Sequence, residues 1–191
     1  MMLNDFANQF KQGRELDQKH RLAFQELIGR QNKLETEDFK LKRSVIVERI
    51  HKADIVNERI MDSFLTTFGI EALLDLDGDA LEAAFLIMQH NMKYINRESV
   101  SLFKRASEDG KIKRRAFCLI KDRYLLSIGL PQLYGTQVLI EGTNKGILRY
   151  RGSISDVEIR RAKLGLGSLE KELELLGISY HKILMAEKAG D

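Results

Sequence analysis

The sequence predicts a mainly α, α+β protein, a helical bundle-like domain with one small β-hairpin. Three observations indicate this fold. The first half of the chain contains no proline and repeats apolar residues at a loose helical spacing. Glycines and capping residues then divide the chain into several shorter helical segments. Near residue 136 the pattern changes to two strand-like runs with a glycine-rich turn between them.

Residues 1–50 are expected to form an N-terminal helical arm, as two helices or one bent helix. Gly13 and Gly29 would each weaken a helix by about 1 kcal/mol relative to alanine. Lys, Arg, Gln and Glu crowd the polar faces of the arm, which favours a solvated outer surface. The alternative is that the arm packs on the core, binds a partner or mediates self-association, because its apolar stripe has to be buried somewhere.

Residues 51–187 are expected to form the mainly helical core. Helices are predicted over 53–68, 79–94, 97–109, 114–128 and 156–164, and after Ser168. Asp54 would cap the first of these, and Asp79 with Glu82 would form a capping box for the second. A hairpin at about 136–151 would have to pack on the helices, since an isolated hairpin is only marginally stable. Cys118 stands among apolar neighbours, so it is predicted to be a buried core residue.

Composition narrows the class of protein. The net charge is +3, the hydrophobic fraction is 43% and the charged fraction is 31%, which suits a soluble protein with a sizeable core. A single cysteine cannot form an internal disulfide, which favours a reducing compartment. The N-terminus lacks a leader pattern, and no run approaches the roughly 20 apolar residues that span a bilayer. We therefore expect a cytoplasmic protein with no membrane partner.

The usual cofactor and metal motifs are missing from the sequence. Phosphate-binding, dinucleotide-binding and serine-nucleophile signatures are absent, and the four histidines lack zinc-site spacing. The acids of Asp75–Asp79 do not begin a calcium loop, because Ala80 and Leu86 occupy the positions that need Gly and Glu. We expect no cofactor and no metal. The basic run 111–115 is expected to be a solvated loop, which makes nucleic acid an unlikely partner.

Polar residues cluster near the ends of apolar segments, where packing of those segments would bring them together. The candidates are Gln89 and His90, Asp122 and Arg123, the run Gln132, Tyr134, Gly135, Thr136 and Gln137, and the pair Arg160 and Arg161. His90 would be the general acid or base, since its pKa lies near neutrality. Asp122 would orient its ring and Tyr134 would donate to developing charge. The competing interpretation is that these are satisfied structural groups at helix ends and turns.

These residues resemble the pattern of a bacterial family catalogued as a domain of unknown function. The matches are Asp54 and Asn57 as D-x-x-N, then Q-H, D-R, Q-x-Y-G-T-Q, and Arg160 or Arg161 before Gly165-Leu166. The resemblance covers about 54–170. It departs at 68–78, where family members often carry a Gly-aromatic-Pro turn. It implies that these polar groups belong to one site, and it implies no activity.

The leading functional hypothesis is an enzyme-like cleft for a small polar, anionic ligand, acting as a hydrolase or lyase. His90, Asp122 and Tyr134 are the predicted catalytic residues. Arg123 and one of the arginines at 160 and 161 would hold the anion through paired N–H donors. The rest of the predicted ligand-binding set is Gln89, Gln132, Gly135, Thr136, Gln137, Asp54 and Asn57. The alternative is a non-catalytic interaction module that uses the amphipathic helices of 2–50 to bind a protein partner or a second copy.

Overall fold

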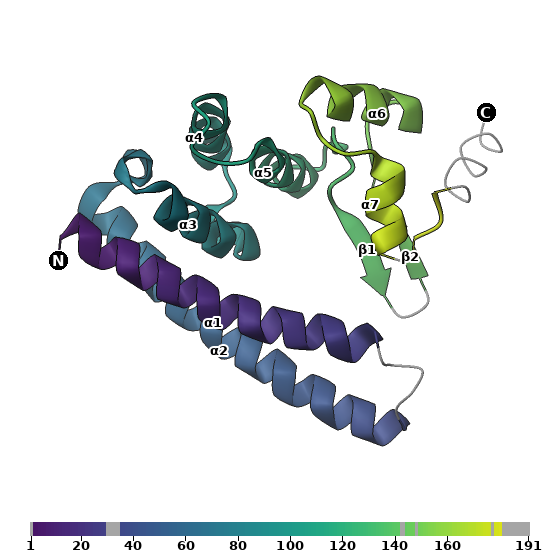
Figure 1. The fold of residues 1–191 in the computed structure, drawn as a ribbon, viewed down its shortest axis with the longest axis horizontal. Coiled ribbons are helices and arrows are strands. Elements are labelled where there is room, and N and C mark those ends of the chain that lie inside the picture. The colour runs from purple at the N-terminus through teal and green to yellow at the C-terminus, as the bar shows by residue number, and fades with distance from the viewer. Residues whose placement is uncertain (1, 30–34, 142–143, 148, 177, 181–191) are drawn as a thin grey trace. The chain divides into compact units, whose positions relative to one another are not determined.

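The computed structural model describes residues 2–29, 35–141, 144–147, 149–176 and 178–180. These residues form seven α-helices, two short 3-10 helices and one pair of antiparallel strands (Figure 1). The predicted mainly α fold with one hairpin is therefore confirmed. The expected turn residues Gly142 and Thr143 lie outside the described residues. Among the helices that the structure describes, none has the length and apolar character needed to cross a membrane.

The chain divides into two compact units, residues 1–94 and 95–191. The sequence-based boundary after residue 50 falls inside helix α2, Thr36–Phe68, which belongs entirely to the first unit. Each unit has its own helices and its own buried side chains.

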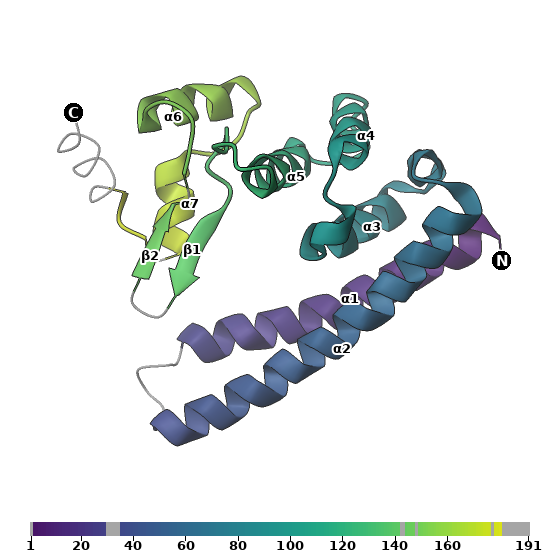
Figure 2. The ribbon, with the colours of Figure 1, turned by 180° about the vertical axis from the view of Figure 1, so that it is seen from behind.

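In the first unit, α1 (Leu3–Gly29) and α2 run side by side as a long helical hairpin, as both views show (Figures 1 and 2). The helix expected over 53–68 already begins at Thr36, because neither glycine nor proline interrupts 36–68. Asp54 is thus an interior residue, and the prediction that it caps the helix is wrong. Gly69 ends α2 as predicted, with φ of 77° and its N–H donating to the Leu65 carbonyl.

The rest of the first unit is η2 (Glu71–Asp75), α3 (Gly78–His90) and η3 (Met92–Tyr94). Asp77 caps α3 by accepting from the Ala80 N–H at 2.9 Å. The predicted cap at Asp79 is wrong, because that carboxylate binds Arg14 of α1 instead, at 2.9 Å. Helix α3 contacts both long helices, and most of its residues are buried.

Aromatic rings pack together at the open end of the hairpin, where α1 begins and α2 ends. The Phe64 ring of α2 lies 5.4 Å from Phe6 and 5.3 Å from Phe10 of α1, and all three side chains are fully buried or nearly so. Such ring pairs add about 0.5–1.5 kcal/mol each beyond the apolar area that they bury. Helix α1 is therefore part of the core of this unit rather than a detached arm.

The second unit begins with α4 (Arg97–Glu108) and α5 (Arg114–Ser127), which pack on each other. Strands β1 (Val138–Glu141) and β2 (Asn144–Ile147) follow, with Val138 opposite Ile147. Helices α6 (Ile154–Lys163) and α7 (Leu169–Leu175) complete the unit, and Ser168 caps α7 as predicted.

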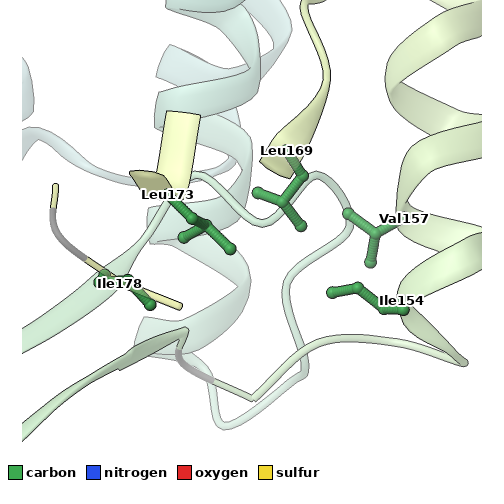
Figure 3. Packing of buried hydrophobic residues seen from close by; sticks show 5 residues of the cluster. All are labelled: Ile154, Val157, Leu169, Leu173 and Ile178. Carbon is green, nitrogen blue, oxygen red and sulfur yellow. The ribbon is translucent and has the colours of Figure 1, made fainter. Parts of the chain in front are cut away.

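A small hydrophobic cluster joins these last elements. Its members come from α6, α7 and the segment after α7, and they face one another in Figure 3: Ile154, Val157, Leu169, Leu173 and Ile178. Val138 and Ile147 of the hairpin pack against this cluster, so the hairpin gains the support that it was expected to need. Cys118 of α5 is fully buried, and burial raises the pKa of its thiol to about 12, which confirms the prediction of a core cysteine.

Candidate functional site

The predicted site residues fall into two groups, one in each unit. The first unit holds Asp54, Asn57, Gln89 and His90. The second holds Asp122, Arg123, Gln132, Tyr134, Gly135, Thr136, Gln137, Arg160 and Arg161. That the two groups meet in one cleft stays a prediction.

A pocket opens beside His90 in the first unit, and we call it the His90 pocket. It is a small hollow that is partly open to solvent, and its volume of about 230 Å³ includes some of that solvent. Helices α1, α2 and α3, with the turn after α3, supply its lining: Asp17, Asp54, Asn57, Glu58, Ile87, His90, Asn91 and Tyr94. Seven of these eight residues are polar or ionisable, while most of the surface that they expose in the pocket is apolar.

His90 is the last residue of α3, and its ring lies beside a buried carboxylate. Its Nε2 is 3.7 Å from Oδ2 of Asp17 and 3.4 Å from Nε2 of Gln89. The His90 side chain is 21% exposed, whereas that of Asp17 is 3% exposed. A proton-transfer group is thus reachable from the pocket while the nearest carboxylate is shielded from water.

Arg21 of α1 holds two carboxylates at once. Its Nε donates to Asp17 at 2.6 Å and its terminal nitrogen donates to Asp54 at 2.6 Å. Gln18 adds a bond to Asp17 at 3.0 Å. Burial raises the pKa of Asp54, and Arg21 opposes that shift. The pairing matters because a buried carboxylate without a partner would be costly.

Asn57 of α2 is buried against Gly13 of α1. Its side-chain N–H donates to the Gly13 carbonyl at 3.3 Å. A Cβ on Gly13 would lie 2.2 Å from Oδ1 of Asn57, so only glycine leaves room for the amide. This close approach brings α1 against the wall of the pocket.

The rim of the pocket carries a separate set of polar contacts. Asn91 donates to Glu58 at 3.0 Å, and Lys93 bridges Glu58 and Asp62 at 3.1 and 2.7 Å. The Tyr94 hydroxyl lies 2.8 Å from Oδ1 of Asp62, and burial together with this bond raises the pKa of Tyr94. The phenol is therefore a neutral donor at physiological pH.

In the second unit, Asp122 organises the turn that follows the only proline, and we call residues 132–137 the Asp122 loop. The carboxylate is fully buried. It accepts from the backbone N–H groups of Leu133, Tyr134 and Thr136 at 2.7, 3.1 and 3.1 Å, and from the Thr136 hydroxyl at 3.0 Å. Burial raises the pKa of Asp122, and these hydrogen bonds oppose the shift. Four donors match the acceptor capacity of a carboxylate.

Gln132 and Gln137 close the same loop on itself. Gln132 donates to the Gln137 carbonyl at 2.9 Å and accepts from the Gln137 N–H at 2.9 Å. Gly135 has φ of 68°, and a Cβ there would lie 2.9 Å from Ile147. Both the backbone conformation and the packing therefore require glycine at this point.

The arginines of α6 hold the carbonyl groups of this region. Arg160 donates to the Leu133 carbonyl at 2.7 Å, and Arg161 donates to the carbonyls of Tyr134 and Gly167, both at 2.9 Å. Arg161 also pairs with Glu172 at 2.6 Å. Asp122 thus binds the N–H groups of the loop while the arginines bind its C=O groups, which is an arrangement that fixes backbone shape.

Tyr134 within the loop and Arg123 next to Asp122 are both half-buried. The ring of Tyr134 packs edge-on against Phe117 at 6.3 Å, and burial raises its pKa. In the part of the chain that the structure describes, no three His, Cys, Asp or Glu residues are grouped so that they could hold a metal ion.

Five residues at or beside the His90 pocket were not among the site residues predicted from the sequence: Asp17, Arg21, Glu58, Asn91 and Tyr94. The sequence does contain a pattern that marks Asp17 as unusual. Phe6, Phe10, Gly13 and Asp17 follow one another at helical spacing, and all four are buried. A charged residue on the core-facing stripe of a helix has to be paired, which marks it as unusual.

The chain belongs to a family of unknown function, DUF6624, whose model matches residues 51–184. This confirms the resemblance to a family of unknown function. The matched region includes His90, Asp54 and the Asp122 loop, while α1 with Asp17 and Arg21 precedes it. No curated protein matches the chain, and no solved structure matches it.

Proposed function

We propose that the chain binds a small polar molecule in the His90 pocket and that His90 transfers a proton to or from it. The observation that carries this proposal is the partly exposed His90 ring, 3.7 Å from a buried carboxylate, in the wall of a partly open pocket lined mainly by polar residues. Histidine is the side chain best matched to proton transfer near neutral pH. Hydrolysis and elimination both need such a group, and these are the reaction classes that we propose.

The lining favours a ligand that carries hydroxyl, amide or amine groups. Asp17, Asp54 and Glu58 present acceptors, and they outnumber the two cations bound to them, Arg21 and Lys93. An anionic ligand was expected to bind Arg123 and one of Arg160 and Arg161, and both of the latter donate to backbone carbonyls. An anionic ligand therefore has less support than a neutral or positively charged one.

A ligand screen on the full-length protein tests the proposal. The panel contains small amines, polyols, amides, carboxylates and phosphates. We expect at least one compound to raise Tm and to shift the NMR signals of His90 and Asn91. In His90→Gln that response should be lost, while the free energy of unfolding changes by less than about 1 kcal/mol.

The control for this screen is His51→Gln. His51 is exposed on α2 and does not line the pocket. It should respond to the same compounds as the unmodified protein does. A response that persists in His90→Gln, or no response to any compound, would count against a ligand site beside His90.

A second candidate function is protein interaction through the first half of α2. Residues 36–52 include no buried residue, and Leu41, Val45 and Val47 are 66%, 39% and 41% exposed. Apolar side chains on a helix gain stability when a partner covers them. This observation supports an interaction surface that could coexist with the pocket.

A further inference from the structure

The contacts of α1 with the pocket lead to a more specific inference, which rests on the proposed role of His90. We infer that Asp17 and Arg21 are positioning residues that set the protonation of His90 in opposite directions. Asp17 stabilises the protonated imidazole, and Arg21 limits that effect by sharing its charge between two carboxylates.

The first step is how the Asp17 carboxylate is bound. Its side chain is almost fully buried, yet it receives bonds from Arg21 at 2.6 Å and from Gln18 at 3.0 Å. Charge-assisted hydrogen bonds of this kind offset the cost of removing a carboxylate from water. The same carboxylate also contacts the His90 ring, at 3.7 Å.

The second step is the effect of this carboxylate on His90. An opposite charge within about 4–6 Å shifts a pKa by roughly 1–3 units toward the charged form. The Asp17 oxygen lies 3.7 Å from Nε2 of His90, which is inside that range. Because Asp17 is buried, salt screens its interaction with His90 less than it screens an exposed pair. Arg21 contacts the same carboxylate and carries the opposite charge, so it disfavours the imidazolium.

Other charged groups face the pocket from the remaining elements. Helix α2 contributes Asp54, which is bound to Arg21, and Glu58, which is bound to Lys93. The turn after α3 contributes Tyr94, which is bonded to Asp62. Asp54 loses this partner when Arg21 is changed, whereas Glu58 and Tyr94 keep their bonds to Lys93 and Asp62. The Asp17 carboxylate lies in salt-bridge range of His90.

Helix α1 would thus take part in the function of the pocket, because it carries both positioning residues. The helix lies before the region that the family model matches, and it supplies a carboxylate 3.7 Å from the predicted acid–base residue. Asp17 and Arg21 are spaced by one helical turn, so both side chains point from one face of α1 toward the same pocket wall.

The test is an NMR titration of the full-length protein labelled at its histidines, from pH ~4.5 to ~9, which spans the ordinary His pKa of about 6.5. Asp17→Asn keeps the shape of the side chain and removes its charge, so the pKa of His90 should fall by about one unit or more. Arg21→Gln should raise that pKa, while Arg21→Lys, which keeps the charge, should leave it near the starting value.

The opposite signs separate this role from a purely structural one, because general loosening of the pocket would move both variants toward the pKa of a free histidine. Asp38→Asn is the matched control. It removes a carboxylate from an exposed part of α2 that pairs with Lys42, and it should not change His90. If Asp17→Asn fails to fold, the Arg21 variants still decide the question.

An unchanged His90 pKa in both variants, or a shift of the same sign in both, would overturn the inference. The outcome is distinct from that of the ligand screen. A screen without hits alongside the expected pKa shifts would reject the proposed ligand site and leave the positioning role of Asp17 and Arg21 intact.

Discussion

Gly13 and Gly29 show how much a single residue depends on its surroundings. Both lie in α1, and by helix propensity alone each glycine costs about 1 kcal/mol relative to alanine. In the structure, a Cβ on Gly13 would collide with the buried Asn57, whereas a Cβ on Gly29 would meet nothing within 4 Å. The same residue type in one helix is therefore required at one position and replaceable at the other.

We expect Gly13→Ala to lower the free energy of unfolding by about 1–3 kcal/mol, because the overpacking cost exceeds the propensity gain. Gly29→Ala should leave stability unchanged or raise it by up to about 1 kcal/mol. Urea denaturation of the two variants measures the difference. Equal effects in both variants would mean that α1 can shift away from Asn57 at little cost.

At the scale of residues, the Q-x-Y-G-T-Q run was predicted to form part of a ligand site, and that stays a prediction. In the structure the loop bonds largely to itself and to Asp122, the residue 11–14 positions before it. The sequence did not indicate Asp17 as a neighbour of His90, because the two residues are distant in the sequence. The predicted pairing of Asp122 with His90 stays a prediction, although the donors of its own loop already occupy the Asp122 carboxylate.

At the scale of elements, the existence of the helices could be predicted and some of their ends could not. Capping residues and glycines marked α4, α5 and α7 correctly. The start of α2 was missed because 36–52 has no breaker, and the cap of α3 was misplaced by two residues. Asp77 and Asp79 are both plausible caps, and a contact from α1 to Asp79 decides between them.

Helices α6 and α7 are joined by an ion pair whose stability should depend on pH. Glu172 of α7 is bound by Arg161 and Arg115. Burial by itself raises the pKa of Glu172, but the two arginines outweigh it, so the pKa lies below the ordinary value of 4.5. A depressed pKa in the folded state contributes stability above the unfolded pKa, and that stability is lost as pH falls through the folded value.

We therefore expect the second unit to lose stability as the pH falls below about 4.5. Glu172→Gln should be less stable near pH 7 by about 1–3 kcal/mol and should show a flatter acid profile. Denaturation curves at several pH values give the comparison. Parallel acid profiles for the two proteins would show that Glu172 does not govern this transition.

At the scale of the whole molecule, the exposed apolar residues of α2 make a testable case for self-association. Burying a leucine side chain in an interface contributes about 1.5–3 kcal/mol to the free energy of association. A change of about 1.4 kcal/mol in that free energy changes Kd tenfold. If Leu41 is covered in a dimer, Leu41→Glu should weaken that dimer roughly tenfold or more, as measured by light scattering or sedimentation.

Ser44→Glu is the control for this experiment. It adds the same charge to the same exposed segment without removing an apolar side chain. It should leave the molecular mass as it is in the unmodified protein. A monomer at every concentration, or equal weakening by both substitutions, would remove the support for an apolar interface at Leu41.

The two units also differ in how far apart along the chain their key contacts lie. The loop clamped by Asp122 and the arginines of α6 closes within residues 122–172, all in the second unit. Asp17 and Arg21, in contrast, emerge early during synthesis and meet His90 only after α3 has been made. During synthesis on the ribosome, the pocket therefore cannot form until α3 has been made, and until then the charged side chains of α1 lack their contact with His90. The Asp122 loop, in contrast, can form from neighbouring segments soon after they have been made.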